Sequence, residues 1–181
     1  MSVDAVLIAV IGVCGTLAAT WLTQKHADHT KERELDHAER QRRADYEDRA
    51  REAALNTRRA SYVALNMQSR QYLTAMRNHV HALKLAPGST PGMDEVEERR
   101  ADYRNCYAEA QMIASDAVLA TAREANGALN QMYGVLKRLE NGTAVEGESA
   151  ESARALIDGT RELLHELRLL MRSDLGVSDP A

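Results

Sequence analysis

Histidine, cysteine and serine are the side chains in this sequence that could carry metal or nucleophilic chemistry. His26 and His29 lie three residues apart, which would place two imidazoles on one helix face. No cysteine pair or suitably placed acid completes a tetrahedral set, so no metal site is predicted. Cys106 and Ser115 are the candidate nucleophiles. Neither has a sequence context that indicates a base and an oxyanion hole, so we expect helix packing and capping, no enzyme activity and no cofactor.

Arginines are the other side chains with binding chemistry. They cluster in the first third of the chain, at Arg40, Arg42, Arg43, Arg49, Arg51, Arg58 and Arg59. Interleaved acids at Asp45, Glu47, Asp48 and Glu52 cancel much of this charge. The net charge of -4 also argues against a dominant phosphate-binding role, so direct nucleic-acid binding is not expected.

The segment from Ala5 to Thr23 has no charged side chain. At about 1.5 Å per residue a helix of this length crosses most of a hydrocarbon core of about 30 Å. A secretory signal peptide would have Lys or Arg before the apolar run, where this chain has only Asp4. The sequence therefore predicts a retained transmembrane anchor over residues 1–24.

Basic residues decide the orientation of this anchor. They all follow it, at Lys25, Lys31, Arg33, Arg40, Arg42 and Arg43. By the positive-inside rule the protein is a single-pass protein of the cell membrane whose C-terminal body is cytoplasmic. The anchor should contact membrane lipid, and Trp21 stands where an interfacial aromatic residue is expected.

Small residues recur along the anchor at alternating spacings of four and three. The stripe consists of Ala5, Ala9, Gly12, Thr16, Ala19 and Thr23. Small side chains let two membrane helices approach closely, so this stripe is a candidate self-association face and predicts a homo-oligomer. The alternative explanation is a general richness in alanine and glycine.

The chain as a whole has the composition of an all-α protein, with Gly 10, Pro 3 and aromatic residues at 4%. Residues 25–54 hold opposite charges at helical spacing, such as Glu39 with Arg43, and almost no large apolar side chain. This pattern predicts an exposed helical stalk that could form a weak coiled coil.

Apolar residues return with a helical period after Leu55. Loops at 86–92 and 141–149 interrupt them, and Ser115 marks a further helix start. Asp94 is the expected N-cap of the second helix, and Leu175-Gly176 is expected to end the last helix. Residues 55–176 are therefore predicted to form a cytoplasmic antiparallel helical bundle, followed by a tail at 177–181.

The last helix has the strongest amphipathic pattern in the chain. The leucines proposed as an apolar partner face are Leu156, Leu163, Leu167 and Leu170. They indicate contact with other membrane or cytoplasmic proteins, or packing within the bundle.

The layout resembles a group of small actinobacterial membrane proteins labelled KilB-like. The resemblance rests on the short span IGVCGTLAATWLTQ, the charged helix after it, and the closing segment from Leu170 to Gly176. The segments are alanine-rich and the resemblance covers the whole chain in layout only. It implies a membrane component that helps plasmid DNA spread during conjugation and is toxic when unregulated, and it carries no catalytic residues.

Three functions fit these observations. The first is a membrane-anchored helical interaction or scaffold protein, with a role in conjugative plasmid transfer. The second is a membrane-perturbing effector, in which several spans assemble into a leak. The third is a helical signal-input module, which requires a binding pocket that the sequence does not mark.

Overall fold

The computed structural model describes the backbone of residues 3–85 and 92–177 and the side chains of residues 37–85 and 92–177. The chain is all-α. Its four helices are α1 (Val3–Leu85), α2 (Asp94–Ile113), α3 (Asp116–Glu140) and α4 (Ala150–Asp174). The chain divides into two units, Met1–Ala53 and Ala54–Ala181, and α1 contributes to both.

The side chains of residues 37–53 in the first unit are exposed along α1. The predicted ion pair is present, since Arg43 lies 3.6 Å from Glu39, and Arg51 lies 3.5 Å from Glu47 at the same spacing. Such exposed pairs each stabilise a helix by about 0.2–0.5 kcal/mol. These contacts favour the helix over a stretch in which it buries no side chain.

The predicted anchor and its small-residue face lie outside the described side chains. Among the residues whose side chains the structure describes, no helix carries an apolar stretch long enough to cross a membrane.

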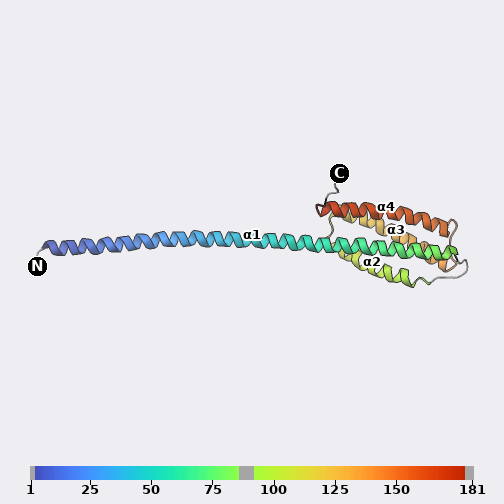
Figure 1. Cartoon of the computed structure of the whole chain (residues 1–181), viewed down its shortest axis with the longest axis horizontal. Coiled ribbons are helices and arrows are strands. Elements are labelled where there is room, and N and C mark those ends of the chain that lie inside the picture. The colour runs from blue at the N-terminus through green and yellow to red at the C-terminus, as the bar shows by residue number, and fades with distance from the viewer. Residues whose placement is uncertain (1–2, 86–91, 178–181) are drawn as a thin grey trace. The chain divides into compact units, whose positions relative to one another are not determined.

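The second unit is a bundle of the C-terminal part of α1 with α2, α3 and α4 (Figure 1). Tyr62 near the start of this part of α1 contacts Asp174 at the end of α4, and Lys84 near its end contacts Glu151 at the start of α4. Contacts between α1 and α2 and between α2 and α3 follow the same pattern. Successive helices therefore run in opposite directions.

The core of this bundle is built from leucine, methionine, alanine and a few tyrosines. Its largest fully buried side chains include Leu65, Tyr72, Met76, Leu129, Met132, Leu136 and Ile157. Helices α3 and α4 approach each other most closely. Ala122, Ala125 and Ala153 are buried in these two helices, and side chains this small permit a short distance between helix axes.

A polar contact joins α2 to α3 at the edge of the core. The Glu97 carboxylate accepts hydrogen bonds from the Tyr133 hydroxyl at 2.6 Å and from Lys137 Nζ at 3.1 Å. The Arg100 guanidinium lies 4.0 Å from the centroid of the Tyr133 ring. The hydrogen bond from Tyr133 lowers the pKa of Glu97.

Of the two helix ends predicted at Leu175-Gly176 and Asp94, the structure confirms the first and contradicts the second. Gly176 has a positive φ of 69° directly after the C-cap Leu175, as predicted for a glycine that ends a helix. The expectation for Asp94 was wrong, because the N-cap is Met93 and Asp94 is already helical. Met93 is buried and its carbonyl accepts the first helical hydrogen bond from Glu97 N, so burial of an apolar side chain fixes this helix start.

Candidate functional site

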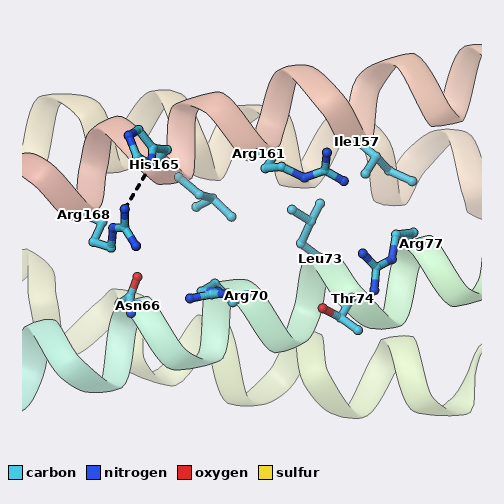
Figure 2. Close-up of a pocket in the computed structure, with 10 residues that line it drawn as sticks. Asn66, Arg70, Leu73, Thr74, Arg77, Ile157, Arg161, His165 and Arg168 are labelled. Carbon is cyan, nitrogen blue, oxygen red and sulfur yellow. Dashed lines mark hydrogen bonds between the residues drawn. The ribbon is translucent and has the colours of Figure 1, made fainter.

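A groove lies between α1 and α4 and is one of several hollows among the described residues. It encloses about 230 Å³ and is open to solvent along one side. Its walls are Asn66, Arg70, Leu73, Thr74 and Arg77 from α1, and Ile157, Arg161, Leu164, His165 and Arg168 from α4. Figure 2 shows the arginines of the two helices on opposite sides of the opening. Leu73, Ile157 and Leu164 are buried and form an apolar floor.

The charged residues that line this groove are all positive, since four arginines and no carboxylate line it. Arg161 lies 3.2 Å from Asp158, which stands outside the lining. Arg168 donates a hydrogen bond to His165 Nδ1 at 3.1 Å, a contact that leaves its charge uncompensated. The Nε of Arg168 is buried and has no hydrogen-bond partner among the described residues. A buried donor without a partner carries a desolvation cost.

A second hollow continues the groove toward the end of α1. It shares Arg77, Ile157 and Arg161 with the first hollow and adds Lys84 and Arg154 to the lining. Two acids neutralise part of this end. Asp158 belongs to the lining, and Glu151 accepts a 2.6 Å hydrogen bond from Lys84, which lowers the pKa of Glu151. No carboxylate lines the hollow at the Arg70 and Arg168 end, although Glu95 shares a neighbouring hollow with Arg70.

The cations of the groove follow a heptad spacing on both helices. One row is Arg70, Arg77 and Lys84 on α1, and the other is Arg154, Arg161 and Arg168 on α4. Seven residues are close to two helical turns, about 10.5 Å. Because α1 and α4 run in opposite directions, Arg70 lies across the groove from Arg168, and Arg77 from Arg161.

Sequence reasoning missed this groove, although the chain carries a signal for it. No Asp or Glu occurs between Glu52 and Asp94, while the same stretch contains Arg58, Arg59, Arg70, Arg77 and Lys84. The interleaved acids that neutralise the arginines of residues 40–52 are absent from this segment. The part of α1 that packs in the bundle therefore exposes basic charge alone.

The chemistry that this arrangement supports is binding of oxyanions. A guanidinium group presents a planar fork of donors that matches a carboxylate or a phosphate. Arg70 and Arg77 are exposed, and no carboxylate lies within ion-pairing distance of either in the described part of the chain. Among the described residues no cluster of metal-binding side chains accompanies them.

The predicted partner face of α4 lies within the bundle. Leu167 is buried in the core, and Leu156, Leu163 and Leu170 are partly buried and pack against it. Packing inside the bundle therefore occupies most of this face. The predicted self-association residues Ala5, Ala9, Gly12, Thr16, Ala19 and Thr23 lie outside the described side chains, as do His26 and His29.

The two candidate nucleophiles lie away from the groove. Cys106 is a half-buried thiol on α2, and burial, together with Glu109 and Asp102, raises its pKa. A raised pKa keeps a thiol protonated and unreactive. Ser115 is the N-cap of α3, as predicted, but its side chain makes no capping hydrogen bond and its backbone N–H donates to the Tyr62 hydroxyl.

Comparison of the chain with protein-family models, curated proteins and solved structures finds no match.

Proposed function

We propose that the protein is a membrane-anchored helical interaction protein whose cytoplasmic bundle binds acidic groups of a protein partner in the α1/α4 groove. The groove carries this proposal, because four arginines line a single cavity without any carboxylate among the lining residues. The uncharged segment from Ala5 to Thr23 supports the anchor, and the basic residues after it support a cytoplasmic body. The resemblance to KilB-like proteins supports a role in the spread of conjugative plasmids.

Signal input is the second candidate function, and the same groove favours it. A cavity of about 230 Å³ lined by Arg70, Arg77, Arg161 and Arg168 is large enough for a small dicarboxylate or phosphate ester. Ligand binding would then bridge α1 and α4. Calorimetric titration of the full-length protein with succinate and with inorganic phosphate separates the two functions, because an interaction protein should bind neither tightly.

The anchor is tested by fractionating cells that express the full-length chain beside cells that express a version beginning at Gln24. We expect the full-length protein in the membrane fraction, released by detergent and not by high salt or alkali. The shorter version should be soluble, because it lacks the apolar run. Recovery of both in the soluble fraction would contradict the anchored function.

The groove is tested in the same cells with Arg70→Glu and Arg77→Glu together. Chemical crosslinking should give fewer adducts with this variant than with the wild type. Arg123→Glu is the matched control, since Arg123 is exposed on α3 and lines neither hollow. Equal crosslinking by all three proteins would contradict binding through the groove.

A further inference from the structure

Helix α2 exposes an acidic face with the same spacing as the basic rows of the groove. Glu95, Asp102 and Glu109 follow one another at seven-residue intervals. Glu95 and Glu109 are exposed, and Asp102 keeps 43% of its side chain exposed although it lies 3.5 Å from Arg99. Their carboxylates therefore repeat about every 10.5 Å along the helix.

The centre of this face is shallow. Ala101 and Ala108 are exposed and are also seven residues apart, beside the acidic row. Small side chains allow a helix to approach a neighbouring pair of helices closely. The acidic row flanks this small-residue strip on one side, and Arg104 is exposed on its other side, so α2 offers carboxylates to one row of arginines in the groove.

The two surfaces lie on different sides of one bundle. The groove is formed by α1 and α4, while α2 packs on the other side of α1, where Tyr72 stacks on Tyr103 at 5.7 Å (Figure 1). Val96, Tyr103 and Ala110 are the buried residues of α2, and the acidic row lies at the edge of this packing, where Glu95 shares a hollow with Arg70 and Thr74 of α1. One copy therefore cannot place its own α2 in its own groove.

We infer that α2 of one copy lies in the α1/α4 groove of a second copy. In this contact the row of Glu95, Asp102 and Glu109 pairs with one arginine row of the groove. The inference rests on the proposed function, because it identifies the acidic partner as the protein itself. Each pair of copies uses two different surfaces, so the contact is head-to-tail and not a symmetric dimer.

A second copy fits the groove better than a nucleic acid does. The floor formed by Leu73, Ile157 and Leu164 offers nothing to a phosphate backbone but can contact Ala101 and Ala108. The net charge of -4 and the acids at the Lys84 end oppose a long polyanion. The acidic row of α2 supplies the required groups at the required spacing.

Charge reversal tests the contact in the full-length protein in detergent. The first variant carries Glu95→Arg, Asp102→Arg and Glu109→Arg, and the second carries Arg70→Glu, Arg77→Glu and Arg161→Glu. Both also carry Gly12→Leu, as does the reference protein, so that the predicted face of the anchor contributes little. Sedimentation velocity at low salt measures the association.

We expect the reference protein to associate and each reversed variant to associate at least tenfold more weakly. An equimolar mixture of the two variants should associate again, because the acidic groove of one then receives the basic α2 of the other. Arg123→Glu should behave as the reference protein does. Circular dichroism establishes that each variant keeps the helical content of the reference.

Three outcomes would overturn the inference. One is a reference protein that stays monomeric, and another is a mixture that associates no better than its components. The third is retention of a labelled DNA duplex by the reference and not by the groove variant, without association between copies. None of these outcomes contradicts the membrane anchor of the proposed function, because cell fractionation tests that anchor separately.

Discussion

Tyr62 and Tyr72 are both buried tyrosines of α1, but their hydroxyl groups have different surroundings. The Tyr62 hydroxyl donates to Asp174 Oδ2 at 2.8 Å and accepts from Ser115 N at 3.3 Å, which joins three helices at one end of the bundle. The Tyr72 hydroxyl is buried and has no hydrogen-bond partner among the described residues. Burial raises the pKa of both groups, so both remain neutral at physiological pH.

Replacing each tyrosine with phenylalanine should give opposite results. Tyr62→Phe should lower the free energy of unfolding by about 1–3 kcal/mol, because Ser115 N and Asp174 lose a partner. Tyr72→Phe should be neutral or stabilising, because it removes a buried polar atom that makes no hydrogen bond. Chemical denaturation followed by circular dichroism measures both. Equal losses for the two variants would show that ring packing, and not the hydroxyl group, sets the stability.

His79 gives the bundle a dependence on pH. The side chain is buried and burial lowers its pKa, against a smaller opposing effect of Glu140. The unfolded chain therefore takes up a proton at a higher pH than the folded chain does. The free energy of unfolding should then fall as the pH is lowered below 6.5, the ordinary value for histidine.

His79→Leu should flatten this dependence, since it removes the group that titrates differently in the two states. Denaturation midpoints between pH 7 and pH 5 measure the effect, and His37→Leu provides the reference for loss of an exposed imidazole. An unchanged slope in the His79 variant would exclude this histidine as the cause.

At the scale of the elements, two helices begin with serine N-caps that differ in their hydrogen bonds. Ser149 accepts from Ser152 N, and Ser152 Oγ accepts in return from Ser149 N, which completes a capping box at the start of α4. Ser115 at the start of α3 makes no such side-chain bond. Identical residues at equivalent positions therefore stabilise their helices to different extents.

Ser149→Ala should lower the free energy of unfolding by about 0.5–2 kcal/mol, the usual effect of losing an N-cap side chain. Ser115→Ala should cost less, because its backbone N–H keeps the bond to Tyr62 in the variant. Thermal unfolding of both variants under the same conditions compares the two effects. A larger loss at Ser115 would contradict the capping geometry.

Helix ends were among the most predictable parts of the fold, because special backbone conformations mark them. Asn141-Gly142 and Leu175-Gly176 end α3 and α4 with glycines at positive φ, a conformation that residues with a Cβ rarely adopt. The start of α2 was predicted at Asp94 from its side-chain chemistry. The burial of Met93 decided it instead, and that burial depends on the whole bundle.

At the scale of the whole molecule, the groove could not be read from local patterns. Its facing arginines, such as Arg77 and Arg161, are far apart in the sequence and meet only because α1 and α4 pack in opposite directions. The four leucines of α4 were equally ambiguous, since a helix that packs in its own bundle and a helix that binds a partner have the same apolar period. Only the stretch without Asp or Glu before Asp94 indicated that the outer face of α1 carries basic charge without neighbouring acids.

Association through the groove should be sensitive to salt. Its contacts join exposed carboxylates to exposed arginines, and salt screens such contacts. Raising the ionic strength from about 0.05 M to about 0.5 M shortens the Debye length several-fold. We expect the dissociation constant of the full-length protein in detergent to rise at least tenfold over this range. A constant that falls with salt would indicate an apolar contact in place of this one.

The groove and the acidic row of α2 lie on different faces of the bundle. This placement determines how an assembly of many copies elongates. Copies joined in this way close into a ring or, where the rotation between copies does not close, form a filament with polarity, in which one tip presents an empty groove and the other an uncovered α2. A subunit with an intact groove and a reversed α2 could still add at one tip, and it would then block further elongation there. Small amounts of such a subunit would shorten every filament in the membrane.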